Sequence, residues 1–146
     1  MSSSVPTSVP YFVTLATTAL GADATVSFGK PLPLYSAPIT LQVTGVVGDA
    51  EPAELGPNYR REETYSIQCE LTAYAGDQNF LDRLSECMTA YALLTVAVAN
   101  DPTLGGSVRF AECGQYQFVP DADAQGQSIG NLTFDVRCSA RITSLT

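Results

Sequence analysis

Two segments of this chain alternate apolar and polar side chains almost without interruption, and they constrain the fold more than any other feature. They cover residues 64–74 and 132–143. Successive side chains of a strand point to opposite faces, so each segment predicts a strand with one buried and one solvated face. A sheet of such strands needs a cover on its dry face. The apolar faces comprise Tyr65, Ile67, Cys69, Leu71 and Ala73 in the first segment, and Leu132, Phe134, Val136, Cys138, Ala140 and Ile142 in the second.

Between these strands, apolar residues recur at steps of three and four and predict the main helix. We expect it to open at Asp77, whose carboxylate can accept hydrogen bonds from free backbone N–H groups, and to end near Asn100. Residues 90–99 carry no charge, so the back of this half would expose apolar surface, which either the first helix or a neighbouring subunit would cover. Its β-branched residues leave a strand as the alternative for this half. The apolar stripe comprises Phe80, Leu84, Cys87, Tyr91, Leu94 and Val98.

The N-terminal part predicts a short amphipathic helix and a connector. Pro10 fits the first turn of a helix that ends at Gly21. Residues 24–28 have the composition of a short strand. Residues 30–38 contain three prolines, which exclude regular structure and predict an extended connection.

Two further long strands complete the predicted sheet. They cover residues 39–47 and 108–119, and the second changes phase around Cys113-Gly114, which indicates a bulge. Residues 121–130 would form the hairpin loop into the last strand. We therefore predict an α+β fold, with a mainly antiparallel sheet of about four long strands and two helices packed on one face.

The length of 146 residues predicts one domain over residues 1–146. We expect a flexible N-terminus at residues 1–8 and a long acidic loop at residues 48–59, which holds Asp49, Glu51 and Glu54 together with two prolines. This loop is either a solvated hairpin tip or a segment that becomes ordered against a partner.

Composition excludes several classes of function. Seven basic residues against fifteen acidic ones give a formal net charge of -8, which should repel nucleic acid rather than bind phosphates. The start lacks the features of a secretion signal, and no apolar run approaches the ~20 residues that span a bilayer. The four cysteines lie in predicted strands and in the main helix without a C-x-x-C pair, so we expect free core thiols in a soluble protein of a reducing compartment rather than disulfides or a zinc site.

The search for catalytic and metal-binding residues gives little. The chain has no histidine, so Ser-His and Cys-His nucleophilic arrangements are excluded. Glu62 and Glu63 are neighbours on a strand and face opposite sides, so they cannot act as a pair. Asp121 to Gly126 imitates the start of a calcium-binding EF loop, yet Leu132 stands at the twelfth position where a glutamate is needed. We expect no enzyme, no metal and no cofactor, with a calcium- or ligand-binding module as the alternative from another class.

The last feature of the sequence with a possible functional meaning is a pattern of charged residues. Basic and acidic residues are adjacent at the start of one predicted strand, and three arginines alternate with apolar residues on the outward face of the sheet. One interpretation is an ordinary solvated face with weak ion pairs; the other is an oriented contact between identical subunits. The residues concerned are Arg60, Arg61, Glu62, Glu63, Arg109, Arg137 and Arg141, near Glu70 and Asp135.

Four segments appear in a fixed order: Arg61-Glu62-Glu63-Thr64-Tyr65-Ser66-Ile67, Ala75-Gly76-Asp77, Asp101-Pro102-Thr103-Leu104-Gly105-Gly106 and Phe134-Asp135-Val136-Arg137-Cys138-Ser139-Ala140-Arg141. This ordered set resembles the tail terminator family of long-tailed, siphovirus-type bacteriophages. With the first helix and the strand and loop after it, the resemblance spans residues 9–142. The Asp-Pro-Thr-Leu-Gly-Gly turn is its most distinctive part.

The resemblance implies a structural virion protein whose copies form a homohexameric ring. Such a ring ends polymerisation of the tail tube and joins the tail to the head and neck, so the implied partners are further copies, the tail tube protein and a neck or connector protein. DNA would pass through an acidic lumen without specific binding. The implied location is the virion tail or neck, with assembly in the host cytoplasm, and the alternative is a head-to-tail connector ring. We expect ring contacts at Arg60, Arg61, Glu62, Glu63, Asp101, Thr103, Leu104, Gly105 and Gly106.

Overall fold

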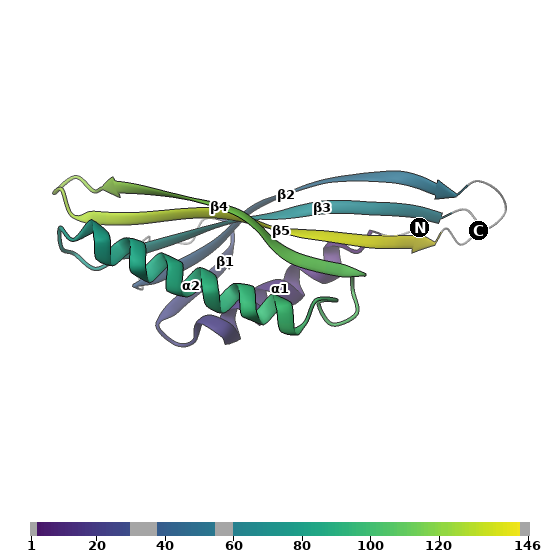
Figure 1. Ribbon diagram of the computed structural model, residues 1–146, viewed down its shortest axis with the longest axis horizontal. Coiled ribbons are helices and arrows are strands. Elements are labelled where there is room, and N and C mark those ends of the chain that lie inside the picture. Colours follow the sequence, from purple (N-terminus) through teal and green to yellow (C-terminus); the bar gives the residue numbers. More distant parts are fainter. Residues whose placement is uncertain (1–2, 30–37, 55–59, 144–146) are drawn as a thin grey trace.

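The computed structural model describes residues 3–29, 38–54 and 60–143. Two helices lie on one side of a long, twisted sheet, whose strands extend beyond the end of the longer helix (Figure 1). Neither helix of the described residues is long and apolar enough to cross a bilayer. In chain order the elements are α1 (Val5–Leu20), β1 (Ala24–Phe28), β2 (Ile39–Glu54), β3 (Arg60–Tyr74), α2 (Phe80–Asn100), β4 (Phe110–Ala122) and β5 (Ser128–Thr143).

The sheet has the strand order β1-β2-β3-β5-β4. The short strand β1 runs parallel to β2, and every other neighbouring pair is antiparallel. The predicted α+β fold with both helices on one face is confirmed. The sheet has five strands rather than four, because residues 24–28 do pair with β2.

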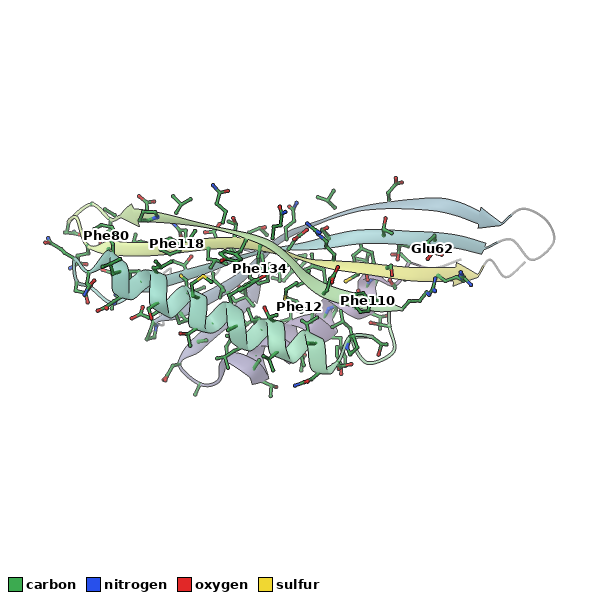
Figure 2. All side chains as sticks on the ribbon, viewed as in Figure 1. Phe12, Glu62, Phe80, Phe110, Phe118 and Phe134 are labelled. Carbon is green, nitrogen blue, oxygen red and sulfur yellow. The ribbon has the colours of Figure 1, made fainter. Side chains whose placement is uncertain are left out.

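The core lies between the sheet and the helices, where the alternating strand faces meet. Leu41, Leu71 and Leu132 are directly opposite one another on β2, β3 and β5, and all three are fully buried. Phe12 of α1 and Leu94 of α2 are buried from the helix side, and Figure 2 shows the Phe12 side chain beneath the sheet. Burying a leucine or phenylalanine side chain contributes roughly 1.5–3 kcal/mol, so this row stabilises the packing of the two layers.

Helix α1 begins earlier than predicted. It starts at Val5 with Pro6 in its first turn, and Pro10 lies inside the helix. Ser8 is fully buried, so the prediction of a flexible segment at residues 1–8 is wrong for residues 5–8, while residues 1 and 2 lie outside the described residues. The reason is a buried contact of this end with β3, described below.

The prediction of a long loop at residues 48–59 is also wrong for its first part. Residues 48–54 continue β2 and pair with β3, with Asp49 opposite Thr64. Residues 55–59 lie outside the described part of the chain. Because β1 ends at Phe28, opposite Val43, this half of β2 is an edge of the sheet, and an edge strand tolerates a proline such as Pro52.

Helix α2 ends at Asn100 as predicted, and its second half is helical, so the strand alternative is wrong. Its N-cap is Asn79 rather than Asp77: Oδ1 of Asn79 accepts a hydrogen bond from the backbone N–H of Asp82 at 3.2 Å. Asp77 instead accepts from the backbone N–H of Asn79 at 3.0 Å. The stripe prediction was partly wrong, because Phe80 and Leu84 of its first turns are exposed.

The hairpin of β4 and β5 contains the predicted bulge. Its register shifts between Cys113 and Tyr116, opposite Val136 and Phe134. The loop is shorter than residues 121–130, because β4 continues to Ala122 and β5 begins at Ser128. All four cysteines are free; Cys69, Cys87 and Cys138 are buried as predicted, whereas Cys113 is only half-buried.

Candidate subunit interface

The turn after α2 is the most sharply defined of the predicted contact elements. Leu104, Gly105 and Gly106 have consecutive positive φ angles of 46°, 68° and 86°. Glycine adopts this left-handed conformation at no steric cost, whereas Leu104 is held in it by a side chain that is fully buried in the core. The backbone N–H of Gly106 donates to Oγ1 of Thr103 at 3.2 Å. Thr103 and the two glycines are therefore presented to solvent, and Leu104 is the internal anchor.

Asp101 connects this turn to α1. Its Oδ1 accepts from the backbone N–H of Gly105 at 3.1 Å, and its Oδ2 accepts from the hydroxyl of Tyr11. The hydrogen bond from Tyr11, with that from Gly105, lowers the pKa of the Asp101 carboxyl. The same bond to Asp101 raises the pKa of the Tyr11 hydroxyl. A Cβ added at Gly105 would lie 2.5 Å from Cε2 of Tyr11, so the ring packs directly on the glycine backbone.

Glu62 lies on the open face of the sheet, in the region beyond the end of α2 (Figure 2). Its Oε1 is 2.8 Å from Nη1 of Arg109, and its Oε2 is 3.6 Å from Nε of Arg141. These groups are partly exposed, so each ion pair stabilises the fold by only about 0–1 kcal/mol. Arg109 follows the Asp101–Gly106 turn closely, and its guanidinium therefore connects the two predicted contact elements.

Glu63 points the other way and holds the start of α1. Its Oε2 accepts from the hydroxyl of Ser3 at 2.7 Å, and its Oε1 accepts from the backbone N–H of Ser4 at 3.0 Å and from the Ser4 hydroxyl at 2.9 Å. The Tyr65 hydroxyl hydrogen-bonds with Ser4 at 2.9 Å and with the buried hydroxyl of Ser8. Burial raises the pKa of Tyr65, although the two serines lower it. Glu63 is therefore engaged inside the subunit.

The position of Glu63 was visible in the sequence, but its role was not. It shares the phase of Tyr65 and Ile67, so the alternation that places those residues in the core also points this carboxylate inward. Nothing in the sequence identifies Ser3 and Ser4 as its partners, because they lie about 60 positions away.

Arg60 and Arg61 begin β3, and their backbones are opposite Thr143 and Ile142 of β5. Their side chains lie outside the described part of the structure. The two predicted contact elements are thus at one end of the sheet, and α1 touches both of them, through Ser4 at Glu63 and through Tyr11 at Asp101.

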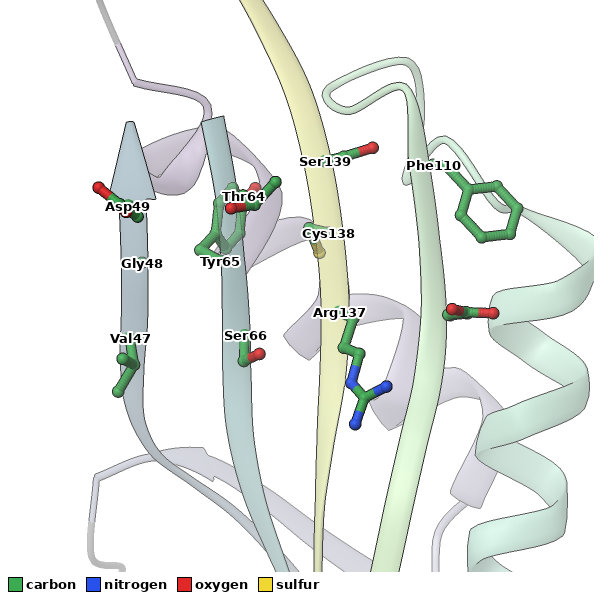
Figure 3. A pocket seen from close by; sticks show the side chains of 11 residues that line it. Val47, Gly48, Asp49, Thr64, Tyr65, Ser66, Phe110, Arg137, Cys138 and Ser139 are labelled. Carbon is green, nitrogen blue, oxygen red and sulfur yellow. The ribbon is translucent and has the colours of Figure 1, made fainter. Parts of the chain in front are cut away.

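The open face of the sheet is hollowed around Arg137 (Figure 3). Nε of Arg137 is 3.3 Å from Oδ2 of Asp135, and Phe110 at the border of the hollow is 51% exposed. Four strands contribute to the lining, which is a shallow mixture of hydroxyl, charged and aromatic groups. Small-molecule sites enclose most of their ligand, so this face suits contact with another surface better.

In the loop Asp121–Gly126, which resembles the start of a calcium-binding loop, the carboxylates accept hydrogen bonds from the loop's own backbone and neighbours. Oδ1 of Asp123 accepts from the backbone N–H groups of Gln125 and Gln127, both at 2.9 Å, and its Oδ2 accepts from the Tyr74 hydroxyl at 3.2 Å. Oδ1 of Asp121 accepts from the N–H of Ala122 at 2.8 Å. No group of three or more metal-ligating side chains occurs in the part of the chain that the structure describes.

A buried arginine escaped sequence-based prediction. Arg83 is only 2% exposed, and its Nη2 is 2.9 Å from Oε1 of Glu86 and 3.6 Å from Oδ2 of Asp77. The sequence feature that could have predicted its burial is its position four residues before Cys87, on the inward side of α2. The backbone of β5 at Gly130 lies close to α2 here, since a Cβ added at Gly130 would lie 2.9 Å from Cβ of Arg83. The residue therefore packs α2 against β5 and takes no part in the exposed surface.

The comparisons with known proteins give no assignment for this arrangement. No family model matches the chain, and no curated protein matches it. The functional interpretation therefore depends on the geometry described above and on the resemblance of its motifs.

Proposed function

We propose that this chain is the tail terminator of a long-tailed bacteriophage, a structural subunit that forms a homohexameric ring, ends tail-tube polymerisation and joins the tail to the neck. The ordered motifs support this assignment. The structural observation that supports it most is the apolar surface left open on the folded subunit. Open large apolar side chains lie on both edges of the sheet and on the back of α2: Phe28, Val47, Leu93, Val96, Phe110, Tyr116 and Val119.

The apolar back of α2 remains exposed although α1 packs beside it, which supports a neighbouring subunit rather than α1 as its cover. Helix α1 packs beside α2, yet Leu93 remains 46% exposed and Val96 57% exposed. Contiguous apolar surface of this kind on a folded domain is typical of a protein contact. In the proposed ring, the next subunit covers it.

The charge of the chain agrees with a ring through which DNA moves. A net charge of -8 disfavours phosphate binding, so DNA in the lumen would not be held. The tail tube protein and a neck or connector protein would contact the two ends of the ring, in the virion and during assembly in the host cytoplasm.

We propose as ring contacts only those predicted residues that are not engaged inside the subunit. Thr103, Gly105 and Gly106 are exposed on a fixed turn, and Glu62 lies on the open face with its two arginines. Arg60 and Arg61 remain proposed contact residues. Leu104 and Glu63 act within the subunit, where they hold the turn and α1 in place.

Mass in solution by light scattering, together with negative-stain images, tests the proposal. We expect a closed ring of six copies, at high concentration or upon addition of the tail tube protein. Arg60→Glu with Arg61→Glu should weaken ring formation, whereas Thr17→Glu with Thr18→Glu, which adds negative charge on the exposed face of α1, should not. Unchanged assembly of the arginine variant would remove these two residues from the contact. A chain that stays monomeric in every condition would contradict the ring.

A head-to-tail connector ring uses the same features of the subunit, so it differs in position rather than in structure. Electron microscopy of virions with the protein labelled separates the two functions. Label at the junction of tail tube and neck supports the terminator, and label next to the portal supports the connector. Calorimetry with calcium tests the ligand-binding module, which requires uptake at the Asp121–Gly126 loop.

A further inference from the structure

Two exposed aromatic rings end the same row of residues across the sheet. Phe28 of β1 is opposite Val43 of β2, and Val43 is opposite Cys69 of β3. Cys69 is in turn opposite Phe134 of β5, and Phe134 is opposite Tyr116 of β4. The three inner residues are at most 5% exposed, whereas Phe28 is 67% exposed and Tyr116 is 52% exposed. The row is therefore a strip of the core that reaches solvent at both edges of the sheet.

The next row on the same face of the sheet has the same character. It runs from Val26 through Leu41, Leu71 and Leu132 to Phe118. The three leucines are fully buried, and the two end residues are partly buried against the core. Both rows belong to the core between the sheet and the helices. The two edges thus present apolar side chains at the same level and on the helix side.

At the β1 end, Phe28 borders an apolar groove. Val5, Val9 and Val13 of α1 line this groove together with Val46 of β2. Residues 3–22 contain no charged residue. A partner that placed a charge in the groove would bury it without a counter-charge, which is strongly unfavourable. The groove therefore suits an uncharged, apolar or aromatic partner.

At the β4 end, contacts with α2 hold Tyr116 in place. Its ring centroid is 5.1 Å from that of Tyr91, and the Tyr91 hydroxyl donates to the carbonyl of Gly114 at 2.7 Å. Glu112 and Arg137 also lie near Tyr116, but they are opposite each other on the open face of the sheet. On the helix side, this edge therefore offers an uncharged aromatic ring.

A second copy of the chain can bring the two ends together. Strand β1 is parallel to β2, and β2, β3, β5 and β4 alternate in direction, so β1 and β4 run in opposite directions. A rotation about an axis along the strands keeps the level and the direction of every strand. It places Tyr116 next to Phe28 of the neighbouring copy, and Phe118 next to Val26. The contact joins two different patches, as closure of a ring requires.

We propose that Tyr116 of one subunit packs on Phe28 and against the α1 groove of the next copy, so that the core rows continue from subunit to subunit. Centres of protein interfaces are poor in charge and rich in aromatic side chains, as both ends of these rows are. This inference rests on the proposed function, because it names the contact through which the ring closes.

Cross-linking of an engineered cysteine pair tests this contact and leaves both rings in place. Ser27 and Gln117 end the row that lies between the two described above. Within a subunit, four strand spacings of roughly 4.8 Å separate them, about 19 Å, which is too far for a disulfide. The variant carries Ser27→Cys and Gln117→Cys, with Cys113→Ser to remove the half-buried native thiol. With a bifunctional maleimide shorter than this gap, we expect a ladder of species from dimer to the closed ring.

Three controls make the cross-link specific. Each single-cysteine variant should give no cross-linked species, because a heterologous contact does not join two copies of the same edge. A dimer from either one would show contact between like edges and overturn the inference. In the third control, Ala122→Cys replaces Gln117→Cys, five residues and about 17 Å further along β4. A ladder of equal yield from this pair would contradict the level that we propose for the contact.

A charge placed on the contact gives a second measurement. Phe28→Glu should raise the concentration needed for half-maximal assembly by about tenfold or more, as the loss of a central interface residue does. Leu81→Glu is the matched control, at a 76% exposed apolar site of α2 that lies outside both ends of the rows, and should leave this concentration unchanged. Assembly of Phe28→Glu at the wild-type concentration would overturn the inference.

Light scattering of the cross-linking samples separates this inference from the proposed function. Closed oligomers without cross-links would overturn the aromatic contact and leave the ring in place. A ladder without closed particles would support the contact and contradict the ring. Monomers without cross-links at every concentration, with and without the tail tube protein, would contradict both.

Discussion

Glu63 accepts hydrogen bonds from both the backbone N–H and the hydroxyl of Ser4, at 3.0 and 2.9 Å, across 59 positions of sequence. Helix α1 has no side-chain cap of its own and no acidic residue in its first turn. A carboxylate from β3 therefore satisfies a free N–H group and places negative charge at the positive end of the helix. The attachment of α1 to the sheet depends on this residue.

Glu63→Ala should lower the free energy of unfolding by about 1–3 kcal/mol, because it removes a buried carboxylate that accepts three part-buried hydrogen bonds from Ser3 and Ser4. Urea denaturation measures the change. Glu62→Ala is the matched control on the opposite face, where loss of two partly exposed ion pairs should cost about 0–1 kcal/mol for each pair. Equal losses for the two variants would contradict the capping role of Glu63.

Two adjacent glycines of the turn should respond differently to alanine. Gly106→Ala adds only the strain of a left-handed alanine, on the order of 1–2 kcal/mol, because no atom lies within 4 Å of the new Cβ. Gly105→Ala adds the same strain and a Cβ placed 2.5 Å from the Tyr11 ring. We expect a lower melting temperature for Gly105→Ala, with Tyr11→Leu partly restoring it. Identical melting temperatures for both alanine variants would show that the ring does not pack on Gly105.

The bond between Tyr11 and Asp101 should make stability depend on pH at both extremes. The folded pKa of Asp101 is lowered, chiefly by Tyr11, so its contribution is present above the unfolded value of 3.8 and is lost as pH falls through the folded value. The folded pKa of Tyr11 is raised by the same bond, so that contribution is present below 10.0 and is lost as pH rises further.

Denaturant unfolding of the wild-type protein and of Tyr11→Phe across this pH range tests the bond. The two curves should differ most between pH 5 and 9 and converge at both ends. Asp101→Asn should likewise weaken the fall in the free energy of unfolding at acid pH, because the variant has no carboxylate to protonate at this position. A constant difference between wild type and Tyr11→Phe at all pH values would assign the effect of the hydroxyl to packing rather than to this hydrogen bond.

The elements that could be predicted from sequence are those whose pattern reports burial directly. The alternation of residues 64–74 and 132–143 placed Ile67, Leu71 and Leu132 correctly in the core, since a strand face is encoded residue by residue. Residues 48–54 were predicted as a loop because they are polar, as an edge strand with solvent on one side can be. What keeps them extended is pairing with β3, and the sequence of residues 48–54 does not reveal that partner.

The candidate interface was less predictable for a related reason. The Asp101–Gly106 turn has a local signal, because two glycines with positive φ are needed there. The contacts that fix it are not local: Tyr11 lies 90 positions from Asp101. We predicted Glu63 and Leu104 as contact residues, and both are buried. The strand phase of Glu63 already indicated an inward side chain, whereas the inward position of Leu104 follows only from the packing of the turn.

The four thiols should react in two groups. Cys69, Cys87 and Cys138 are buried, and burial raises the pKa of Cys87 and of Cys138 to about 11, whereas Cys113 is only half-buried. With a disulfide reagent at pH 8, Cys113 should react first and the other three only as the protein unfolds, because the thiolate is the nucleophile and needs access. Cys113→Ser should abolish the fast phase and Cys69→Ser should not.

The pH dependence of that fast phase tests the environment of Cys113 itself. Burial raises its pKa, with a hydrogen bond involving Thr95 opposing the shift. The rate should therefore keep rising with pH beyond the point where a thiol of ordinary pKa near 8.5 begins to level off. A rate that levels off near pH 8.5 would mean that Cys113 is solvated, and that the bulge at Gly114-Gln115 leaves this part of the β4 edge open to water.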